Sequence, residues 1–369
     1  MNIHVDNEEI RDLDEPFVAI SNHPSFFDWA FAARALENHA PHFIVNRLYF
    51  RGILGFLLRK IGAEPRSLMT ADTVSVRRML RLAQTGRSMC IFPDPSISLT
   101  GDTEGEIAPG TYKLLKKMGR TVVGIRHEGS FHTKTPWGKG LRRGRVDTRA
   151  FILFTPEELK TLSEEDGNAR LHDLVERRVL EPRERGVSYK SRHMAENLEK
   201  LFFLCPHCGK QGQISTKGSH VSCNCCGRTA VMNEYYEFIW DGNEGPENLS
   251  RWYSFQRQAM LRLLEGRNFV VESDTVFHRF TDETGFVPVG PGHLRLDIEG
   301  LHYAGQNGEV LFYPIENIRP LFQKLSSGRI QLFYGAECHE FELPDKNLPP
   351  NYWRLAAEHL RAMALTKTN

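Results

Sequence analysis

The sequence lacks the features that mark membrane-spanning and secreted chains. No run of about 18 apolar residues occurs in it, so no transmembrane helix is expected. The N-terminal segment MNIHVDNEEIRDLDEP is polar and acidic, whereas a signal peptide has a basic start and an apolar stretch. These absences predict a protein of the cytoplasm.

Excess charge and a disulfide framework are also missing. The 47 Lys and Arg residues nearly balance the 46 Asp and Glu residues, for a net charge of +1. The charge of the whole molecule therefore does not indicate a nucleic-acid partner, and any anion binding must come from local patches. The seven cysteines are an odd number, and four of them form two C-x-x-C pairs. This usage indicates a metal site in a reducing compartment.

The first part of the chain alternates short apolar runs with helical segments. The expected strands are Phe17 to Ile20, Phe43 to Val45, Ser88 to Phe92, Val122 to Ile125 and Phe151 to Phe154. Strands that alternate with helices predict an α/β domain over residues 1–165, with a mainly parallel sheet flanked by helices.

Two segments between these strands have helical periodicity. VSVRRMLRLAQTG is expected to turn Val76, Leu80 and Ala83 inward and to end at Gly86. GTYKLLKKMG is expected to turn Leu114, Leu115 and Met118 inward and to stop at Gly119.

The remaining chain divides by composition. A charged helical linker with few core candidates is expected over residues 166–202, a four-cysteine module over 203–232 and a helical connector over 233–267. Residues 268–369 contain alternating strands broken by Gly, Asn or Pro, and then a helix with Trp353, Ala356, Ala357 and Leu360 along one stripe. This order predicts an antiparallel, β-rich C-terminal domain, similar to a pleckstrin-homology (PH) barrel.

The stretch NHPSFFD places His23 and Asp28 where a buried strand gives way to a helix, with Ser25 as the expected N-cap. Both residues then lie at the carboxyl edge of the sheet, where open α/β sheets bind ligands. A histidine held by a carboxylate can take a proton from a hydroxyl near neutral pH. Here the substrate itself would supply that hydroxyl.

This stretch resembles the first conserved block of the PlsC-like lysophospholipid acyltransferases. NRLYFRGILGFLLRKIGAEPRS is similar to their second block, IFPDPSIS to their third and the region of PGTYKLLKKMGRTVVGIRHEG to the fourth, so the resemblance covers about residues 5 to 160. The third block departs from the usual F-P-E-G-x-x-S: Asp94 replaces Glu, Pro95 replaces Gly, and the neighbouring Arg is absent. The later four-cysteine module resembles the C-terminal zinc ribbon that a subgroup of this family has.

The resemblance implies transfer of a fatty acyl group from acyl-CoA or acyl-carrier protein to the hydroxyl of a lysophospholipid, such as 1-acylglycerol-3-phosphate, in phospholipid biosynthesis. It implies His23 as the general base, Asp28 as its orienting partner, and Asp94, Arg66 and Ser25 as substrate-binding residues. The alternatives are a glycerol-3-phosphate or lyso-aminolipid acyltransferase, and a non-catalytic lipid-binding scaffold whose acyltransferase domain has decayed.

The two C-x-x-C pairs are Cys205 with Cys208 and Cys223 with Cys226, each followed by glycine. Four thiolates at this spacing predict a closed, structural Zn²⁺ site. The residues between the pairs include only Lys210 and Lys217 as cations and no aromatic residue, so nucleic acid is not an expected partner.

The segment from Leu48 to Lys60 is apolar with basic flanks, and WGKGLRRGR adds a second basic cluster. Both patterns are typical of a surface that lies against anionic lipid head groups, although an internal helix and a solvated loop explain them equally well. We therefore expect peripheral association with the inner face of the membrane.

Overall fold

The computed structural model divides the chain into two compact units. The first contains Met1–Pro136 and Leu141–Ser191, and the second contains Trp137–Gly140 and Arg192–Asn369. The structure describes residues 2–66, 73–94, 97–102, 107–108, 110–176, 181–242, 244–265, 269–318, 321–335 and 337–367. Within these ranges, every helix is too short or too polar to cross a lipid bilayer.

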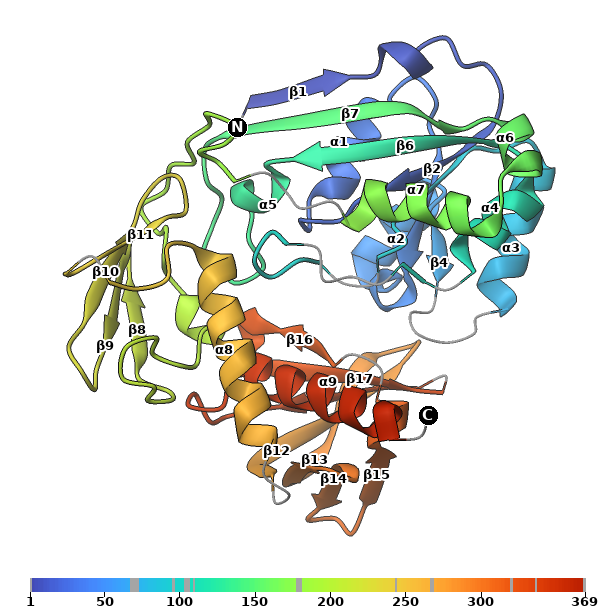
Figure 1. The fold of residues 1–369 in the computed structure, drawn as a ribbon. Helices are drawn as coiled ribbons and strands as arrows, with labels where there is room; N and C mark the ends of the chain where they lie inside the picture. Colours follow the sequence, from blue (N-terminus) through green and yellow to red (C-terminus); the bar gives the residue numbers. More distant parts are fainter. Residues whose placement is uncertain are drawn as a thin grey trace. The chain divides into compact units, whose positions relative to one another are not determined.

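The first unit is built on a seven-stranded sheet (Figure 1). Its strands are β1 (Asn2–Asp6), β2 (Phe17–Ser21), β3 (His42–Asn46), β4 (Glu64–Arg66), β5 (Met89–Ile91), β6 (Thr121–Glu128) and β7 (Arg145–Phe154). They lie in the order β1-β7-β6-β2-β5-β3-β4, and each neighbouring pair is parallel except β6 with β7. The predicted α/β domain with a mainly parallel sheet is therefore confirmed.

Helices cover both faces of this sheet, because alternate residues of the central strand β2 enter two separate cores. Val18 and Ile20 join one core and Phe17 and Ala19 the other. The helices are α1 (Asp28–Ala35), α2 (Gly52–Lys60), α3 (Thr73–Gln84), α4 (Thr111–Met118), α5 (Ser130–Thr133), α6 (Pro156–Thr161) and α7 (Glu164–Glu176), with short 3-10 turns at Glu8–Ile10 and Arg47–Tyr49. Residues of α3, α4, α6 and α7 line the first core, and those of α1 line the second.

The two helical predictions hold in part. In α3, Ala83 is buried as predicted, but Val76 is exposed and Leu80 is half-buried. The buried face of the helix consists of Ser75, Met79 and Ala83, which are spaced four residues apart. In α4 the prediction holds for Leu115 and Met118, with Leu114 half-buried, and Gly119 ends the helix at φ +61°, in the left-handed region that favours glycine.

Part of the range 166–202, which was expected to be a linker, belongs to the core of the first unit. Helix α7 buries Leu171, Leu174 and Val175 in the first unit's core, although the rest of this helix is charged. Three apolar residues at this spacing form one helical face, which is enough to attach the helix to the sheet. The division between the units falls after Ser191, inside the range 166–202.

The second unit contains two antiparallel sheets and two long helices (Figure 1). The small sheet has the order β11-β10-β9-β8 and contains β8 (Ile214–Lys217), β9 (His220–Cys223), β10 (Thr229–Met232) and β11 (Phe238–Trp240), so it extends past the predicted end of the cysteine module at residue 232. Helix α8 (Leu249–Leu264) follows, in the predicted connector, and Gly266 lies outside the described residues.

The large sheet has the order β15-β14-β13-β12-β18-β17-β16 and is followed by helix α9 (Pro350–Lys367). Its strands are β12 (Val270–Thr281), β13 (Gly285–Asp297), β14 (Gly300–Gly305), β15 (Val310–Pro314), β16 (Phe322–Lys324), β17 (Arg329–Tyr334) and β18 (Glu337–Glu342), with 3-10 turns at Ile315–Asn317 and Leu325–Ser327. The antiparallel, β-rich C-terminal region is thus confirmed, and the predicted stripe of α9 is buried.

A buried polar contact joins α8 and α9 to the segment that leads into the first cysteine pair. Gln256 of α8 donates to the carbonyl of Leu201 and accepts from the amide of Phe203, while Asn351 of α9 also donates to Leu201. Trp252 stacks on Phe202 at a centroid distance of 4.3 Å. The backbone before Cys205 is therefore held by both helices.

Candidate active site

His23 and Asp28 meet at the carboxyl end of β2. Nδ1 of His23 lies 3.0 Å from Oδ2 of Asp28, and the same oxygen accepts the backbone N–H of Ser25 at 2.6 Å. Asp28 is fully buried and His23 is 21% exposed. Since the ionised carboxylate can only accept, Nδ1 carries the proton and Nε2 keeps its lone pair. Nε2 makes no hydrogen bond to any residue within the described ranges, so a substrate hydroxyl can bind there.

The local sequence explains why the pair forms. Helix α1 begins at Asp28. The helix dipole favours a negative charge in the first turn of a helix, so it favours the carboxylate of Asp28 at this position. The helix does not begin at Ser25 as predicted, and its N-cap is Phe27, which makes no side-chain cap. Ser25 is instead buried, with its hydroxyl donating to the carbonyl of Lys134 at 3.0 Å. Its backbone and not its side chain supports Asp28.

The segment after β5 reaches the same site. The ring of Phe92 lies 4.7 Å from the imidazole of His23, on centroids, and packs against it. Asp94 follows two residues later and is buried, while Pro95 and Ser96 lie outside the described residues. Because β5 is the direct neighbour of β2, the sheet places the third block beside the His–Asp pair.

A second histidine lies behind the pair, and sequence reasoning missed it. His127 of β6 is fully buried, with Nε2 at 3.1 Å from Oγ of Ser21 and Nδ1 at 3.0 Å from Oγ1 of Thr148. The hydroxyl of Ser21 donates to the carbonyl of Asn22, so it accepts from Nε2–H of His127, and Thr148 donates to Nδ1. The ring is thus neutral and held in one tautomer.

Asn22 ties this histidine to the loop that carries His23. Its side chain accepts from the amide of His127 at 2.8 Å and donates to the carbonyl of His127 at 3.2 Å. The only signal in the sequence was the position of Asn22 directly before His23, because the partner is 105 residues away. These two bonds fix where the backbone of His23 leaves the sheet.

Replacing Asn22 with alanine is expected to lower the free energy of unfolding by about 2–4 kcal/mol, since it leaves one buried N–H and one buried C=O of His127 unpaired at about 1–3 kcal/mol each. Urea unfolding measures this loss. Asn7→Ala is the matched control: it removes one hydrogen bond from a half-buried side chain, to the carbonyl of Ala35, and should cost about 1 kcal/mol. Equal losses in the two variants would contradict the assigned role.

Acid should destabilise the first unit through two buried histidines. Burial lowers the pKa of His127 to about 4, and burial together with Arg185 and Arg142 lowers the pKa of His132 to about 3. An unfolded histidine has a pKa of about 6.5, so between pH 6.5 and 4 the unfolded chain binds protons that the folded unit does not. The free energy of unfolding therefore falls as the pH falls through this window, by about 3 kcal/mol for His127 alone.

Urea unfolding from about pH 7 to about pH 4 tests this dependence through its slope. In His127→Gln the free energy of unfolding is expected to fall less steeply with falling pH than in the wild type, because glutamine does not titrate. This holds whatever the effect of the substitution on stability at pH 7. An unchanged slope in both His127→Gln and His132→Gln would show that other groups cause the acid sensitivity.

The region around this site is similar to known proteins. Residues 2–128 match the family model Acyltransferase. The match covers about a third of the chain and includes His23 and Asp28. Among solved structures, the crystal structure of the 1-acyl-sn-glycerophosphate (LPA) acyltransferase PlsC from Thermotoga maritima is similar, with 19% sequence identity and a TM-score of 0.40 over 48% of this chain and 70% of that chain.

The first unit brings together some of the predicted site residues and separates another. His23, Asp28 and the backbone of Ser25 are in contact, and Asp94 follows the neighbouring strand. Arg66 ends β4, which is three strands away from β2 in the sheet order, or about 14 Å at the usual strand spacing. Arg66 thus shares the carboxyl edge of the sheet with His23 but does not adjoin it.

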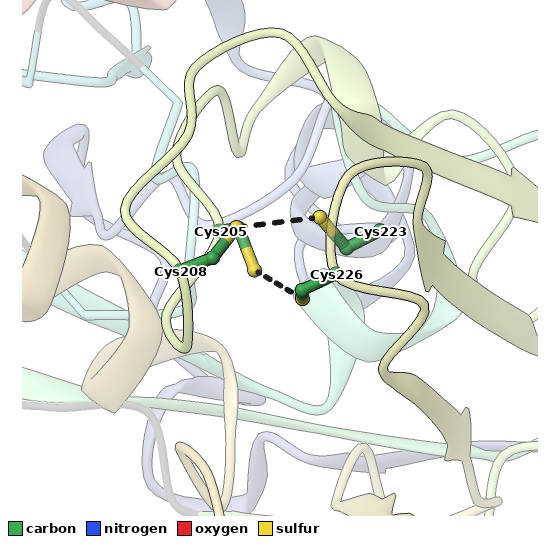
Figure 2. Close-up of side chains that lie close together, drawn as sticks. All are labelled: Cys205, Cys208, Cys223 and Cys226. Carbon is green, nitrogen blue, oxygen red and sulfur yellow. Dashed lines mark hydrogen bonds between the residues drawn. The ribbon is translucent and has the colours of Figure 1, made fainter.

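The four predicted cysteines form a cluster in the second unit (Figure 2). The sulfur atoms of Cys205, Cys208, Cys223 and Cys226 all lie within 4.8 Å of one another. Cys225 is exposed and is not in this group. Burial raises the pKa of the Cys205 thiol, so a bound cation is needed to favour its thiolate form.

The backbone around the two cysteine pairs repeats. The amide of Cys205 donates to the carbonyl of Lys210 and the amide of Gly209 to the carbonyl of Cys205, while Cys223, Gly227 and Arg228 make the same two bonds in the second pair. Gly209 and Gly227 have φ of +66° and +73°, which is why each pair is followed by glycine. Two matching turns that face each other give four sulfur ligands, and such a set can hold a metal ion.

Proposed function

We propose that this chain is an acyltransferase that moves a fatty acyl group from acyl-CoA or acyl-carrier protein to the hydroxyl of a lysophospholipid such as 1-acylglycerol-3-phosphate. The observation that carries the proposal is the hydrogen bond between His23 and the buried Asp28, within a region that matches the acyltransferase family. The bond leaves Nε2 of His23 as a base at the edge of the sheet.

In the proposed reaction Nε2 of His23 removes the proton of the acceptor hydroxyl as its oxygen attacks the thioester carbonyl. Asp28 keeps the ring oriented and stabilises the imidazolium that forms. The C–S bond of the tetrahedral intermediate then breaks, and the proton on His23 passes to the leaving thiolate. The products are one ester and one free thiol, so no redox partner is required.

The acceptor is expected to bind along the carboxyl edge of the sheet. Asp94, beside β2, is proposed to position the glycerol hydroxyl, and Ser25 to shape the site through its backbone. Arg66 is proposed to bind the acceptor's phosphate, as a charge-assisted partner at the far end of the same edge. Arg66→Ala should then raise KM for a phosphate-bearing acceptor and leave that for a phosphate-free one unchanged.

Turnover by the purified protein tests the activity. Labelled oleoyl-CoA is incubated in parallel with lysophosphatidic acid, glycerol 3-phosphate and a lyso-aminolipid, and each reaction is repeated with His23→Ala. The proposal predicts acylation of the lysophosphatidic acid that depends on His23. If wild type and variant give the same background rate with all three acceptors and with either donor, the chain is not this enzyme.

We propose Zn²⁺ as the ion of the four-cysteine cluster. Four thiolates in tetrahedral reach are the ligand set that structural zinc sites use, and no ligand position is left for a substrate. The ion would hold the two turns together and so stabilise the small sheet. For the C-terminal region we propose a PH-like domain, because seven antiparallel strands in the order β15-β14-β13-β12-β18-β17-β16 precede one closing helix.

A further inference from the structure

Helix α2 of the acyltransferase domain exposes almost all of its apolar side chains. Ile53 is 83% exposed and Phe56 63%, and Leu54, Leu57 and the following Ile61 are exposed by half or more. Gly55 is the only residue buried in the helix, since a Cβ there would lie 2.2 Å from the carbonyl carbon of Phe50. The helix therefore rests on the preceding turn through its glycine, and its large side chains point away from the unit.

The charged side chains of α2 and of the turn before it are all cations. From His42 to Ala63 the sequence contains no Asp or Glu, whereas Arg47, Arg51, Arg59 and Lys60 are all cations. Arg59 and Lys60 lie in the last turn of α2 and are exposed. A second copy of the chain would bring the same cations against each other, so charge complementarity favours an anionic partner over self-association.

Exposed aromatic side chains join this helix to the His–Asp pair. Phe26 lies in the loop between His23 and Asp28, and its ring is 6.4 Å from that of Tyr49, which precedes α2. Phe26, Tyr49 and Trp29 of α1 are each exposed by about half. Tyr and Trp are enriched where one end of a side chain meets lipid and the other water.

We infer that Ile53, Leu54, Phe56, Leu57 and Ile61, here called the α2 surface, insert into the interface of an anionic lipid bilayer, with Arg59 and Lys60 at the head groups. Nine helical residues extend about 14 Å, so α2 lies in the membrane plane and does not cross it. The inference deepens the proposed function, because the contact of Phe26 with Tyr49 places the loop between His23 and Asp28 next to the bilayer that supplies a lysophospholipid.

Co-sedimentation of the full chain with vesicles tests the surface. Vesicles of phosphatidylcholine with phosphatidylglycerol are compared with vesicles of phosphatidylcholine alone. Ile53→Glu/Phe56→Glu is expected to lower binding to both by at least 100-fold, since two large side chains no longer insert. Arg59→Gln/Lys60→Gln is expected to lower binding to the anionic vesicles roughly 30-fold, at about 1 kcal/mol per cation, and to leave binding to neutral vesicles unchanged.

The matched control is Ile239→Glu/Val310→Glu, which makes the same change in charge at two exposed apolar residues, 58% and 75% exposed, of the second unit. It should bind as the wild type does. Circular dichroism melting confirms that all variants fold. If Ile53→Glu/Phe56→Glu binds vesicles as tightly as the wild type does, the inference is wrong. It is also wrong if the wild type is a dimer that this variant converts to monomers and neither protein binds vesicles.

The assay contains no acyl donor, so it is independent of turnover. A protein that acylates no acceptor but loses vesicle binding in the α2 variant would retain this inference and lose the proposed function. A protein that acylates lysophosphatidic acid and binds vesicles equally in both forms would retain the function and lose the inference.

Discussion

His23→Ala is expected to lower kcat/KM for a lysophospholipid acceptor by about 10³- to 10⁴-fold, the largest effect on activity that we predict. The imidazole is the only candidate base that the described structure places at this edge with a free lone pair and a buried carboxylate behind it. Without it, the acceptor hydroxyl must lose its proton to water. The measurement is initial-rate kinetics with oleoyl-CoA and lysophosphatidic acid.

Asp28→Asn should have an effect of similar size, about 10²- to 10⁴-fold. Oδ2 of Asp28 accepts from both the His23 ring and the Ser25 amide, and an asparagine cannot neutralise the imidazolium or hold the ring in the same tautomer. The loss should appear mainly in kcat, because the side chain is fully buried and does not touch the acceptor.

The chain offers a matched control in a second His–Asp pair. His4 lies 3.7 Å from Asp147 in the same unit, but it is 70% exposed and belongs to the edge strand β1. His4→Ala should therefore leave kcat/KM within about twofold of the wild type, since an exposed pair contributes little to the structure. If His23→Ala retained a tenth of wild-type activity, the proposed base would have to be another group.

Cys208→Ser is expected to abolish zinc binding and to unfold the small sheet, the largest effect on stability that we predict. Structural zinc contributes about 10–16 kcal/mol to folding in small zinc-binding peptides. The cysteine cluster joins the turn that precedes β8 to the turn between β9 and β10, so both turns depend on it. Elemental analysis should give one zinc per wild-type chain and less than about a tenth of that per variant chain.

The loss of stability in Cys208→Ser should extend beyond the small sheet. Gln256 and Asn351 hold the backbone just before Cys205, so a released turn also weakens the contacts of α8 and α9 with that segment. We expect faster amide exchange in residues 201–240 and a lower melting temperature for the second unit. The first unit's acid sensitivity, which depends on His127 and His132, should be unchanged.

Cys225→Ser is the control, because this cysteine lies between two members of the cluster in sequence but is exposed and outside it. Its zinc content and melting temperature should match those of the wild type. Full zinc content in Cys208→Ser would mean that the four sulfur atoms do not bind the ion as a set.

Local patterns were sufficient for much of the fold. Alternation of strands and helices predicted the parallel sheet of the first unit, and the stripe on the final helix predicted its buried face. The same periodicity misplaced the inward face of α3, since a helix with Ser75, Val76 and Met79 has more than one plausible stripe and only the sheet beneath it decides which is buried. Three apolar residues in a charged helix were too weak a signal to place α7 in the core.

By itself the sequence determined the elements that depend on residues close together in the chain: the His23–Asp28 spacing across one turn, the two cysteine pairs with their glycines, and the order of strands and helices. The tertiary structure alone decided what joins distant residues. In the fold, Asn22 connects His127 to the loop that carries His23, and Phe92 packs against the imidazole. Arg66 lies three strands away from β2. Such contacts depend on strand order and on packing across the sheet, which no short stretch of sequence encodes.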